Sequence, residues 1–174
     1  YAIEANARVV KDFIGKNCLL MAVVKADGYG HGATTVARAA LNGGASNLGV
    51  ATLQEGIELR RAGFDCPILL LGNLTNFNEL STCFHWELIP TLSSVREAWL
   101  CQNLAQGAGK KFKVHLKVDT GMTRLGCDLQ DALALFNTIN SLDNLDLEGV
   151  YSHLALADAD LKDDNILMND LQHQ

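Results

Sequence analysis

The sequence predicts an α/β fold built on a parallel sheet, and two observations lead to this class. Short apolar runs typical of buried strands alternate along the chain with amphipathic, helix-like segments. No internal repeat, low-complexity tract or Pro/Ser-rich linker interrupts the 174 residues, so we expect a single domain. Strict alternation of strand and helix favours a parallel sheet, either doubly wound or closed as a barrel.

Six apolar segments are the candidate strands. In chain order they are Leu19–Lys25, Leu48–Ala51, Ile68–Leu71, Leu88–Pro90, Phe112–Asp119 and Leu147–Ser152. A (β/α)8 barrel has eight strands, so the sequence has two fewer than that architecture requires.

Helical patterns lie between these strands. Small and aliphatic residues recur on one face from Ala33 to Leu41. Ser94 and Glu97 have the spacing of a capping box at the start of another helix. Asp128 is a candidate N-cap for a further helix, with apolar positions at Leu129, Leu133 and Phe136. The last residues, Asp163–Gln174, have the pattern of a helix start.

The composition excludes several classes of protein. A formal net charge of -6 argues against nucleic acid or an anionic membrane as a partner. The longest apolar stretch, Cys18–Val24, is too short to span a bilayer, and the N-terminus lacks the pattern of a secretory signal. Irregular cysteine spacing without a CxxC pair indicates reduced, mostly buried thiols of a cytosolic protein, not a disulfide framework or a zinc site. The five cysteines are Cys18, Cys66, Cys83, Cys101 and Cys127.

Lys25 ends the first apolar run, in AVVKADGYGHG. Functional groups of parallel α/β proteins gather at the carboxyl ends of strands. A lysine that ends a buried strand loses part of its hydration, which favours a neutral amine able to form a Schiff base or accept a proton from carbon. The alternative is a lysine whose ammonium reaches solvent. Tyr29 and His31 follow in a glycine-rich loop, as donors that could reach a phosphate or as ordinary loop residues.

The strand Phe112–Asp119 carries polar residues on a face that a barrel would bury. Alternation places one set of side chains toward the helices, namely Phe112, Val114, Leu116 and Val118. The opposite face carries Lys113, His115, Lys117 and Asp119. Inside a barrel these residues form a site, whereas on an edge strand they are simply hydrated. Arg124 lies in the following loop, in DTGMTRLG, where its guanidinium can bind a carboxylate or a phenolate.

His153 follows the sixth candidate strand, in GVYSHLALAD. It is a candidate base or ring-stacking partner, although a lone histidine is more often structural. No HExxH or other ligand spacing accompanies it, so we expect no metal.

At these three places the sequence resembles bacterial alanine racemase. The matching motifs are AVVKADGYGHGA (Ala22–Ala33), VHLKVDTGMTRLG (Val114–Gly126) and GVYSHLALAD (Gly149–Asp158), in the same order and at compatible spacing. PTLSS (Pro90–Ser94) is also similar. The resemblance covers almost the whole chain. It implies a parallel (β/α)8 TIM-type barrel, with about six of its eight strands present, that binds pyridoxal 5'-phosphate (PLP).

The resemblance also implies a role for each motif residue. Lys25 would hold PLP as a Schiff base and act as one of two catalytic bases. Tyr29 would help bind the cofactor's phosphate, and His153 would lie against its pyridine ring. Arg124 would contact the cofactor's phenolic oxygen and the substrate carboxylate. Lys117 stands where some family members carry a carbamylated lysine that orients this arginine.

Some parts of the family pattern differ or are missing. Thr123 stands where the family usually has a small, glycine-like residue, and Leu154 stands at a position that is often aromatic. The family barrel continues with two more strands and a separate β-domain, whose tyrosine is the second base in the partner subunit's site. No residue of this sequence matches those parts, and Tyr151 is not that tyrosine.

The implied activity is the interconversion of L- and D-alanine in the cytoplasm, which supplies D-alanine for peptidoglycan. The resemblance implies a homodimer for the full-length protein. We expect the 174 residues alone to have little or no racemase activity, because the second base is missing. We also expect them to be marginally stable, because an incomplete barrel has open sheet edges.

Three alternatives remain open. A PLP-binding protein of cofactor homeostasis has a similar barrel without robust catalysis. A PLP-independent Schiff-base aldolase needs no phosphate-binding loop near its lysine. A serine or broad-specificity amino-acid racemase is a closer variant of the same chemistry.

Overall fold

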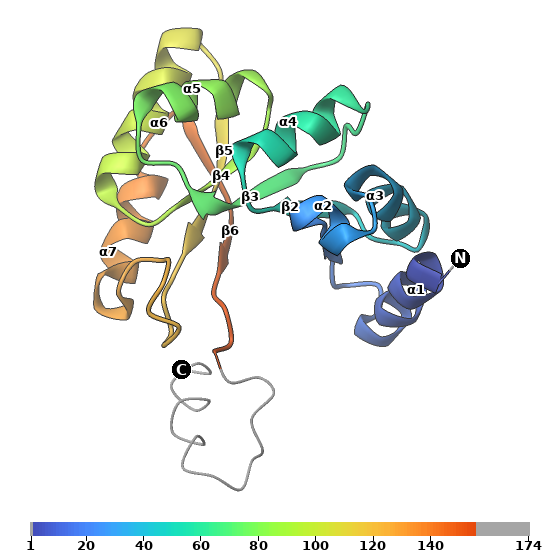
Figure 1. Cartoon of the computed structure of the whole chain (residues 1–174). Coiled ribbons are helices and arrows are strands. Elements are labelled where there is room, and N and C mark those ends of the chain that lie inside the picture. The colour runs from blue at the N-terminus through green and yellow to red at the C-terminus, as the bar shows by residue number, and fades with distance from the viewer. Residues whose placement is uncertain (1, 156–174) are drawn as a thin grey trace, which may run out of the picture. The chain divides into compact units, whose positions relative to one another are not determined.

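The computed structural model describes residues 2–155, in which β-strands alternate with helices along the chain (Figure 1). Contacts divide the chain into two compact units. The first contains the residues up to Gly72 together with Asn76–Pro90, and the second contains Asn73–Thr75 and the residues from Thr91 onward. The helix start expected in Asp163–Gln174 lies outside the described residues.

Parallel strands form the centre of the first unit, in the order in which they follow along the chain. They are β1 (Met21–Val23), β2 (Asn47–Val50) and β3 (Ile68–Asn73). The helices of this unit are α1 (Ala2–Ile14), α2 (Lys25–Gly30), α3 (Ala33–Asn42), α4 (Leu53–Arg61) and α5 (Phe77–His85). Figure 1 shows α1 alongside α3.

Most of β2 and the first half of β3 are buried on both faces, whereas β1 is only partly buried and its Val23 is exposed. Leu48 and Val50 of β2, and Ile68 and Leu70 of β3, are completely buried, and the intervening residues of these strands are also buried. Continuous burial is typical of a parallel sheet with helical cover, and burying each aliphatic side chain of this size stabilises the fold by about 2 kcal/mol. The apolar runs are therefore explained by packing.

The second unit has the same alternating plan. Its strands are β4 (Ile89–Leu92, whose first residues belong to the first unit), β5 (Phe112–Lys117) and β6 (Leu145–Tyr151), and its helices are α6 (Val95–Ala108) and α7 (Leu129–Asn140). Both α6 and α7 pack against β6, and they contact each other (Figure 1). β5 pairs in parallel with β4 on one side and β6 on the other, so it is not an edge strand. This pairing excludes the edge-strand explanation for its polar face.

The helices α4, α5 and α6 begin with a side-chain capping hydrogen bond, whereas α2, α3 and α7 do not. The expected capping box at Ser94 and Glu97 is confirmed, and an unpredicted second box, Thr52 with Glu55, starts α4. Asp128 is the N-cap residue of α7, but its side chain makes no capping hydrogen bond. The prediction of Asp128 as the N-cap residue is therefore confirmed in position, although without a side-chain hydrogen bond.

All six predicted strands are present, with shifted ends. The largest shift is in the first, because β1 ends at Val23 and Lys25 already belongs to α2. The amphipathic helices α1, α4 and α5 were not predicted individually. None of the five cysteines, all of which lie in residues 2–155, forms a disulfide; Cys83, Cys101 and Cys127 are buried and Cys18 is exposed. Within residues 2–155, no helix has the length and hydropathy needed to cross a membrane.

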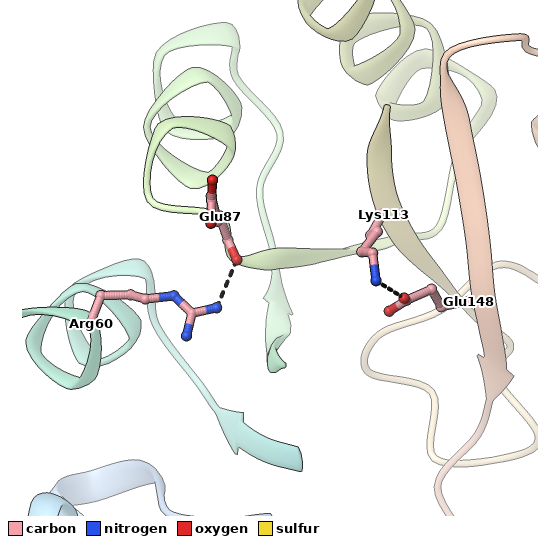
Figure 2. A network of polar contacts seen from close by, with 4 residues as sticks. All are labelled: Arg60, Glu87, Lys113 and Glu148. Carbon is pink, nitrogen blue, oxygen red and sulfur yellow. Dashed lines mark hydrogen bonds and ion pairs between the residues drawn. The ribbon is translucent and has the colours of Figure 1, made fainter. Parts of the chain in front are cut away.

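Arg60 connects separate loops of the first unit through their backbone carbonyls. Its Nη1 donates to the carbonyl oxygens of Phe64 (2.6 Å) and Cys66 (2.8 Å). Its Nε donates to the carbonyl of Trp86 (3.1 Å) and its Nη2 to that of Glu87 (2.8 Å), as Figure 2 shows for Glu87. The planar guanidinium thus joins the end of α4 to the turns before β3 and β4.

We predict that Arg60→Lys lowers the free energy of unfolding by about 1–3 kcal/mol, because one ammonium cannot reach all four carbonyls. Urea denaturation measures the change. The control is Arg61→Lys, since the neighbouring Arg61 is exposed and lies over the Trp86 ring at 5.4 Å. Equal losses in the two variants would contradict the prediction.

Candidate functional site

Lys25 lies at the carboxyl end of β1, where the chain turns in an unusual way. Val24 before it is buried, and Lys25 itself is half-buried, which agrees with the expected partial loss of hydration. Residues 26–29 all have left-handed backbone angles, with φ between 50° and 62°. Each non-glycine residue in this conformation costs about 1–2 kcal/mol. The short element α2 is therefore a left-handed turn that its surroundings must stabilise.

Hydrogen bonds within the loop hold this left-handed turn. The Gly28 N–H donates to the Val24 carbonyl (2.9 Å), and the Gly32 N–H donates to the Asp27 carbonyl (2.9 Å). The carboxylate of Asp27 accepts the N–H of Ala33, the first residue of α3, at 2.7 Å. The turn after Lys25 is thus linked directly to the start of the next helix.

Gly28 is required by space as well as by its backbone angles. A Cβ atom at Gly28 would lie 2.8 Å from Cγ2 of Val36. Tyr29 is 59% exposed. The Nδ1 atom of His31 lies 3.1 Å from the carbonyl oxygen of Tyr29, so this imidazole contacts the backbone of its own loop.

The carboxylate of Glu55 joins the ends of β1 and β2. Its Oε1 accepts the N–H of Ala26 (2.7 Å), and its Oε2 accepts the N–H groups of Ala51 (2.7 Å) and Thr52 (3.0 Å). Sequence inspection did not identify this residue, although the Thr-x-x-Glu spacing of TLQE was a detectable capping signal.

Arg124 lies on a closed loop after β5 in the second unit. The Cys127 N–H donates to the Lys117 carbonyl, and the Asp119 N–H donates to the Cys127 carbonyl, both at 2.9 Å. These bonds bring the two ends of the loop together. Gly126, at φ 123°, permits the close approach, because a Cβ there would lie 2.6 Å from the Asp119 nitrogen.

Asp119 stabilises this loop from inside. Its Oδ1 accepts the N–H groups of Thr123 (3.0 Å) and Gly121 (2.9 Å), and its Oδ2 accepts the N–H of Arg124 (3.2 Å). These backbone hydrogen bonds, from Thr123 first, lower the pKa of the Asp119 carboxyl. Asp119 therefore binds the backbone of the segment that carries Arg124, whose side chain is exposed.

A cluster of polar side chains lies on one face of the second unit's sheet. Lys117 is only 7% exposed, and its Nζ lies 5.3 Å from the centre of the Tyr151 ring. The Tyr151 hydroxyl and Thr91 Oγ1 are hydrogen-bonded at 2.7 Å, and the rings of His115 and Tyr151 meet edge-on at 6.2 Å. Burial raises the pKa of Tyr151, so its phenol is not suited to act as a base near neutral pH.

The polar face of β5 is not uniform along its length. Lys113, at the start of the strand, is exposed and forms an ion pair with Glu148 of β6 (Figure 2). His115 is half-buried and Lys117 is buried, both nearer the carboxyl end. Only the latter part of the strand therefore gives the enclosed polar face that the sequence predicted.

His153 follows β6 and is exposed. The preceding Ser152 connects the two strand ends, because its Oγ donates to the Val118 carbonyl at 2.8 Å, and the Val118 N–H donates to the Tyr151 carbonyl at 3.0 Å. The backbone that leads to His153 is thus held at the end of β5. In residues 2–155, no group of three or more metal-ligating side chains is present.

Each predicted site residue follows the carboxyl end of a strand, apart from Lys117, which is the last residue of β5. Lys25 and Tyr29 share one turn of the first unit, and Lys117, Arg124 and His153 belong to the second. The donor set of the first unit is a primary amine and a phenol, groups that fit the aldehyde and the phosphate of PLP. The second unit offers a guanidinium, which fits a phenolic oxygen.

In both units parallel strands alternate with helices, which defines a parallel α/β protein, and Lys25 stands directly after the first strand. The family model "Alanine racemase, N-terminal domain" matches residues 1–173. The chain therefore belongs to the alanine racemase N-terminal domain family, and the predicted fold class is confirmed.

Individual relatives agree with this assignment. The chain is 62% identical over 159 residues to the alanine racemase of Prochlorococcus marinus, and the aligned region covers 91% of this chain and 41% of that protein. Alanine racemase of Clostridium difficile 630 in complex with cycloserine superposes with a TM-score of 0.87 at 31% identity, over 99% of this chain and 47% of that one. Histidine racemase of Leuconostoc mesenteroides subsp. sake superposes with a TM-score of 0.85 at 28% identity, over 99% of this chain and 45% of that one. The chain thus spans less than half the length of these proteins.

Thr123, which departs from the family pattern, has a left-handed backbone with φ of 53°. A β-branched residue is strained there, whereas glycine is not. We predict that Thr123→Gly stabilises the protein by about 0.5–1 kcal/mol, since the relieved strain exceeds the entropy cost of glycine. Thr138→Gly, inside α7, should destabilise it instead, as measured by urea denaturation. The prediction fails if Thr123→Gly lowers stability as Thr138→Gly does.

Burial lowers the pKa of the His115 imidazole, although the charge of Glu148 opposes the shift. The unfolded chain, with an ordinary histidine pKa of about 6.5, then binds this proton more tightly than the folded chain. We therefore predict that stability falls as the pH decreases through about 6.5 toward the lower folded-state pKa. His115→Gln should reduce the difference in urea midpoint between pH 7.5 and pH 5.5. An unchanged difference would show that His115 is not responsible.

Proposed function

We propose that the protein is a PLP-dependent amino-acid racemase acting on alanine, and that this chain supplies the cofactor-binding lysine and one of its two catalytic bases. The observation that carries the proposal is the half-buried Lys25 at the end of β1, held on a left-handed turn. Membership of the alanine racemase N-terminal domain family supports it.

Each described site residue has a role in this proposal. The amine of Lys25 binds the cofactor aldehyde and moves the Cα proton on one face of the substrate. Arg124 binds the substrate carboxylate and the cofactor's phenolic oxygen, and Tyr29 donates to the phosphate. His153 lies against the pyridine ring, and a carbamylated Lys117 would orient Arg124. PLP, when bound, delocalises the negative charge that develops at Cα after the proton leaves.

Racemisation requires a second acid–base group on the opposite face of Cα. Tyr151 is unsuited, because its hydroxyl is hydrogen-bonded to Thr91 and burial raises its pKa. We place the second group outside this chain, on the tyrosine that the family resemblance implies for the partner subunit of a homodimer. We also propose that the enzyme works in the cytoplasm and supplies D-alanine for peptidoglycan.

The first experiment locates the cofactor bond. The protein, as its gene encodes it, is incubated with PLP and reduced with borohydride, which converts a Schiff base to a stable secondary amine. Peptide mass spectrometry should then find one pyridoxyl group per chain on Lys25. Lys25→Arg should abolish the adduct, whereas Lys110→Arg, at an exposed lysine, should not. Adducts scattered over several lysines, with none enriched at Lys25, would contradict the proposal.

The second experiment identifies the substrate. Racemisation of L- and D-alanine is followed by chiral chromatography, with serine and histidine assayed in parallel because a histidine racemase shares the fold. Lys25→Arg should lower kcat by a factor of about 10²–10⁴, the usual contribution of a positioned base. Faster turnover of serine or histidine than of alanine would assign a different amino acid to the site.

A further inference from the structure

We infer that Glu55 is a positioning residue for Lys25, holding the lysine backbone in place through the N–H of Ala26; this inference rests on the proposed role of Lys25. Glu55 is not part of the donor set described above, and its carboxylate faces backbone groups. Its Oε1 lies 2.7 Å from the nitrogen of Ala26, a residue 29 positions away in the sequence. The bond is therefore a tertiary contact made at the residue directly after the lysine.

The backbone on both sides of Lys25 is fixed, by β2 before the lysine and by Glu55 of α4 after it. Before the lysine, the Val24 N–H donates to the Gly49 carbonyl at 2.8 Å. After it, the Ala26 N–H donates to Glu55, whose other oxygen accepts the N–H groups of Ala51 and Thr52. The carboxylate of Glu55 thus links the chain after β1 to the chain after β2, beyond the hydrogen bond between Val24 and Gly49. Lys25 lies between these two links.

The geometry of Ala26 shows why such an attachment is needed. Ala26 has φ of 50°, a left-handed conformation that strains an alanine relative to an ordinary helical or extended one. A hydrogen bond from the backbone N–H to a charged carboxylate can offset this strain. Without that acceptor we expect Ala26 to relax, which rotates the peptide plane next to Lys25 and moves its side chain.

Both carboxylate oxygens are occupied, which makes the amide substitution informative. Glutamine has one acceptor oxygen and one NH2 group, so in Glu55→Gln either Ala26 or the Ala51–Thr52 pair faces a donor instead of an acceptor. Glu55→Asp keeps both acceptor oxygens on a shorter side chain, so it should restore part of the function.

Glu97 offers a matched control in the second unit. It occupies the same position in a capping box, and its Oε2 accepts the N–H groups of Ser93 (2.7 Å) and Ser94 (3.1 Å). Glu97→Gln therefore removes a comparable capping carboxylate without changing any contact that the structure gives to Lys25 or to residues 26–29. A difference between Glu55→Gln and Glu97→Gln separates positioning of the lysine from general helix capping.

The first measurement needs no cofactor. Hydrogen–deuterium exchange of the peptide that covers residues 24–31 is compared in the wild type, Glu55→Gln and Glu97→Gln, in the protein as its gene encodes it. We expect exchange in this peptide to accelerate in Glu55→Gln alone. Exchange equal to that of the wild type in Glu55→Gln would overturn the inference.

The second measurement follows the lysine itself. The rate of pyridoxyl adduct formation on Lys25, trapped with borohydride at successive times, should fall on the order of ten- to a hundredfold in Glu55→Gln, because small displacements of a reacting group have effects of this size. Glu55→Asp should recover part of the rate, and Glu97→Gln should keep it, at comparable urea midpoints. Equal rates for Glu55→Gln and Glu97→Gln would show that Glu55 acts only as a helix cap.

The two measurements also separate this inference from the proposed function. If the wild type forms no adduct on Lys25, the proposed function is wrong. Faster hydrogen–deuterium exchange of residues 24–31 in Glu55→Gln would still show that Glu55 stabilises this turn. If the wild type forms the adduct and Glu55→Gln forms it at the same rate, the proposed function stands and the positioning role of Glu55 falls.

Discussion

A chain that leaves a buried parallel strand must satisfy its backbone N–H groups within a few residues, and acidic side chains meet this constraint here. Glu55 in the first unit accepts three backbone N–H groups, Asp119 in the second accepts another three, and Glu97 accepts two at the start of α6. The loops at the strand ends depend on these carboxylates for their shape.

The same constraint explains how functional side chains stay available while their backbone is held. Glu55 binds the N–H of Ala26, the residue after Lys25, and Asp119 binds the N–H of Arg124 itself. Such hydrogen bonds fix the position of the residue without involving its side chain. Preorganisation of this kind is what a site that handles small anionic groups requires.

Left-handed backbone accompanies both of these segments. Residues 26–29 after Lys25 and Thr123 before Arg124 have positive φ. Such strain persists only where surrounding contacts impose it, and it is often concentrated at functional sites. In the second unit, burial supplies a further constraint, because the phenol of Tyr151 contacts His115, Lys117 and Thr91. A single aromatic ring thus organises the polar residues on that face of the sheet.

The sequence could predict features that depend on neighbouring residues, but not features that depend on contacts between distant segments. Alternating apolar runs located all six strands, and Ser94 with Glu97 located a helix start, because both signals are local. The strand Leu19–Lys25 was extended too far, since its apolar pattern does not reveal the left-handed turn that begins after Lys25. Asp128 had the right residue type for a cap, but its side chain makes no capping bond, because residue type alone does not set the orientation of a side chain.

The sequence by itself determined the parallel α/β class, the family motifs and the position of Lys25, Arg124 and His153 after strands, because periodicity and motif spacing are properties of the chain alone. Only the tertiary structure decided that Ala26 binds a carboxylate 29 residues away and that β5 lies between two strands. It also decided which part of the polar face of β5 is enclosed. These features follow from hydrogen bonds and packing between segments distant in sequence, and no local pattern specifies such partners.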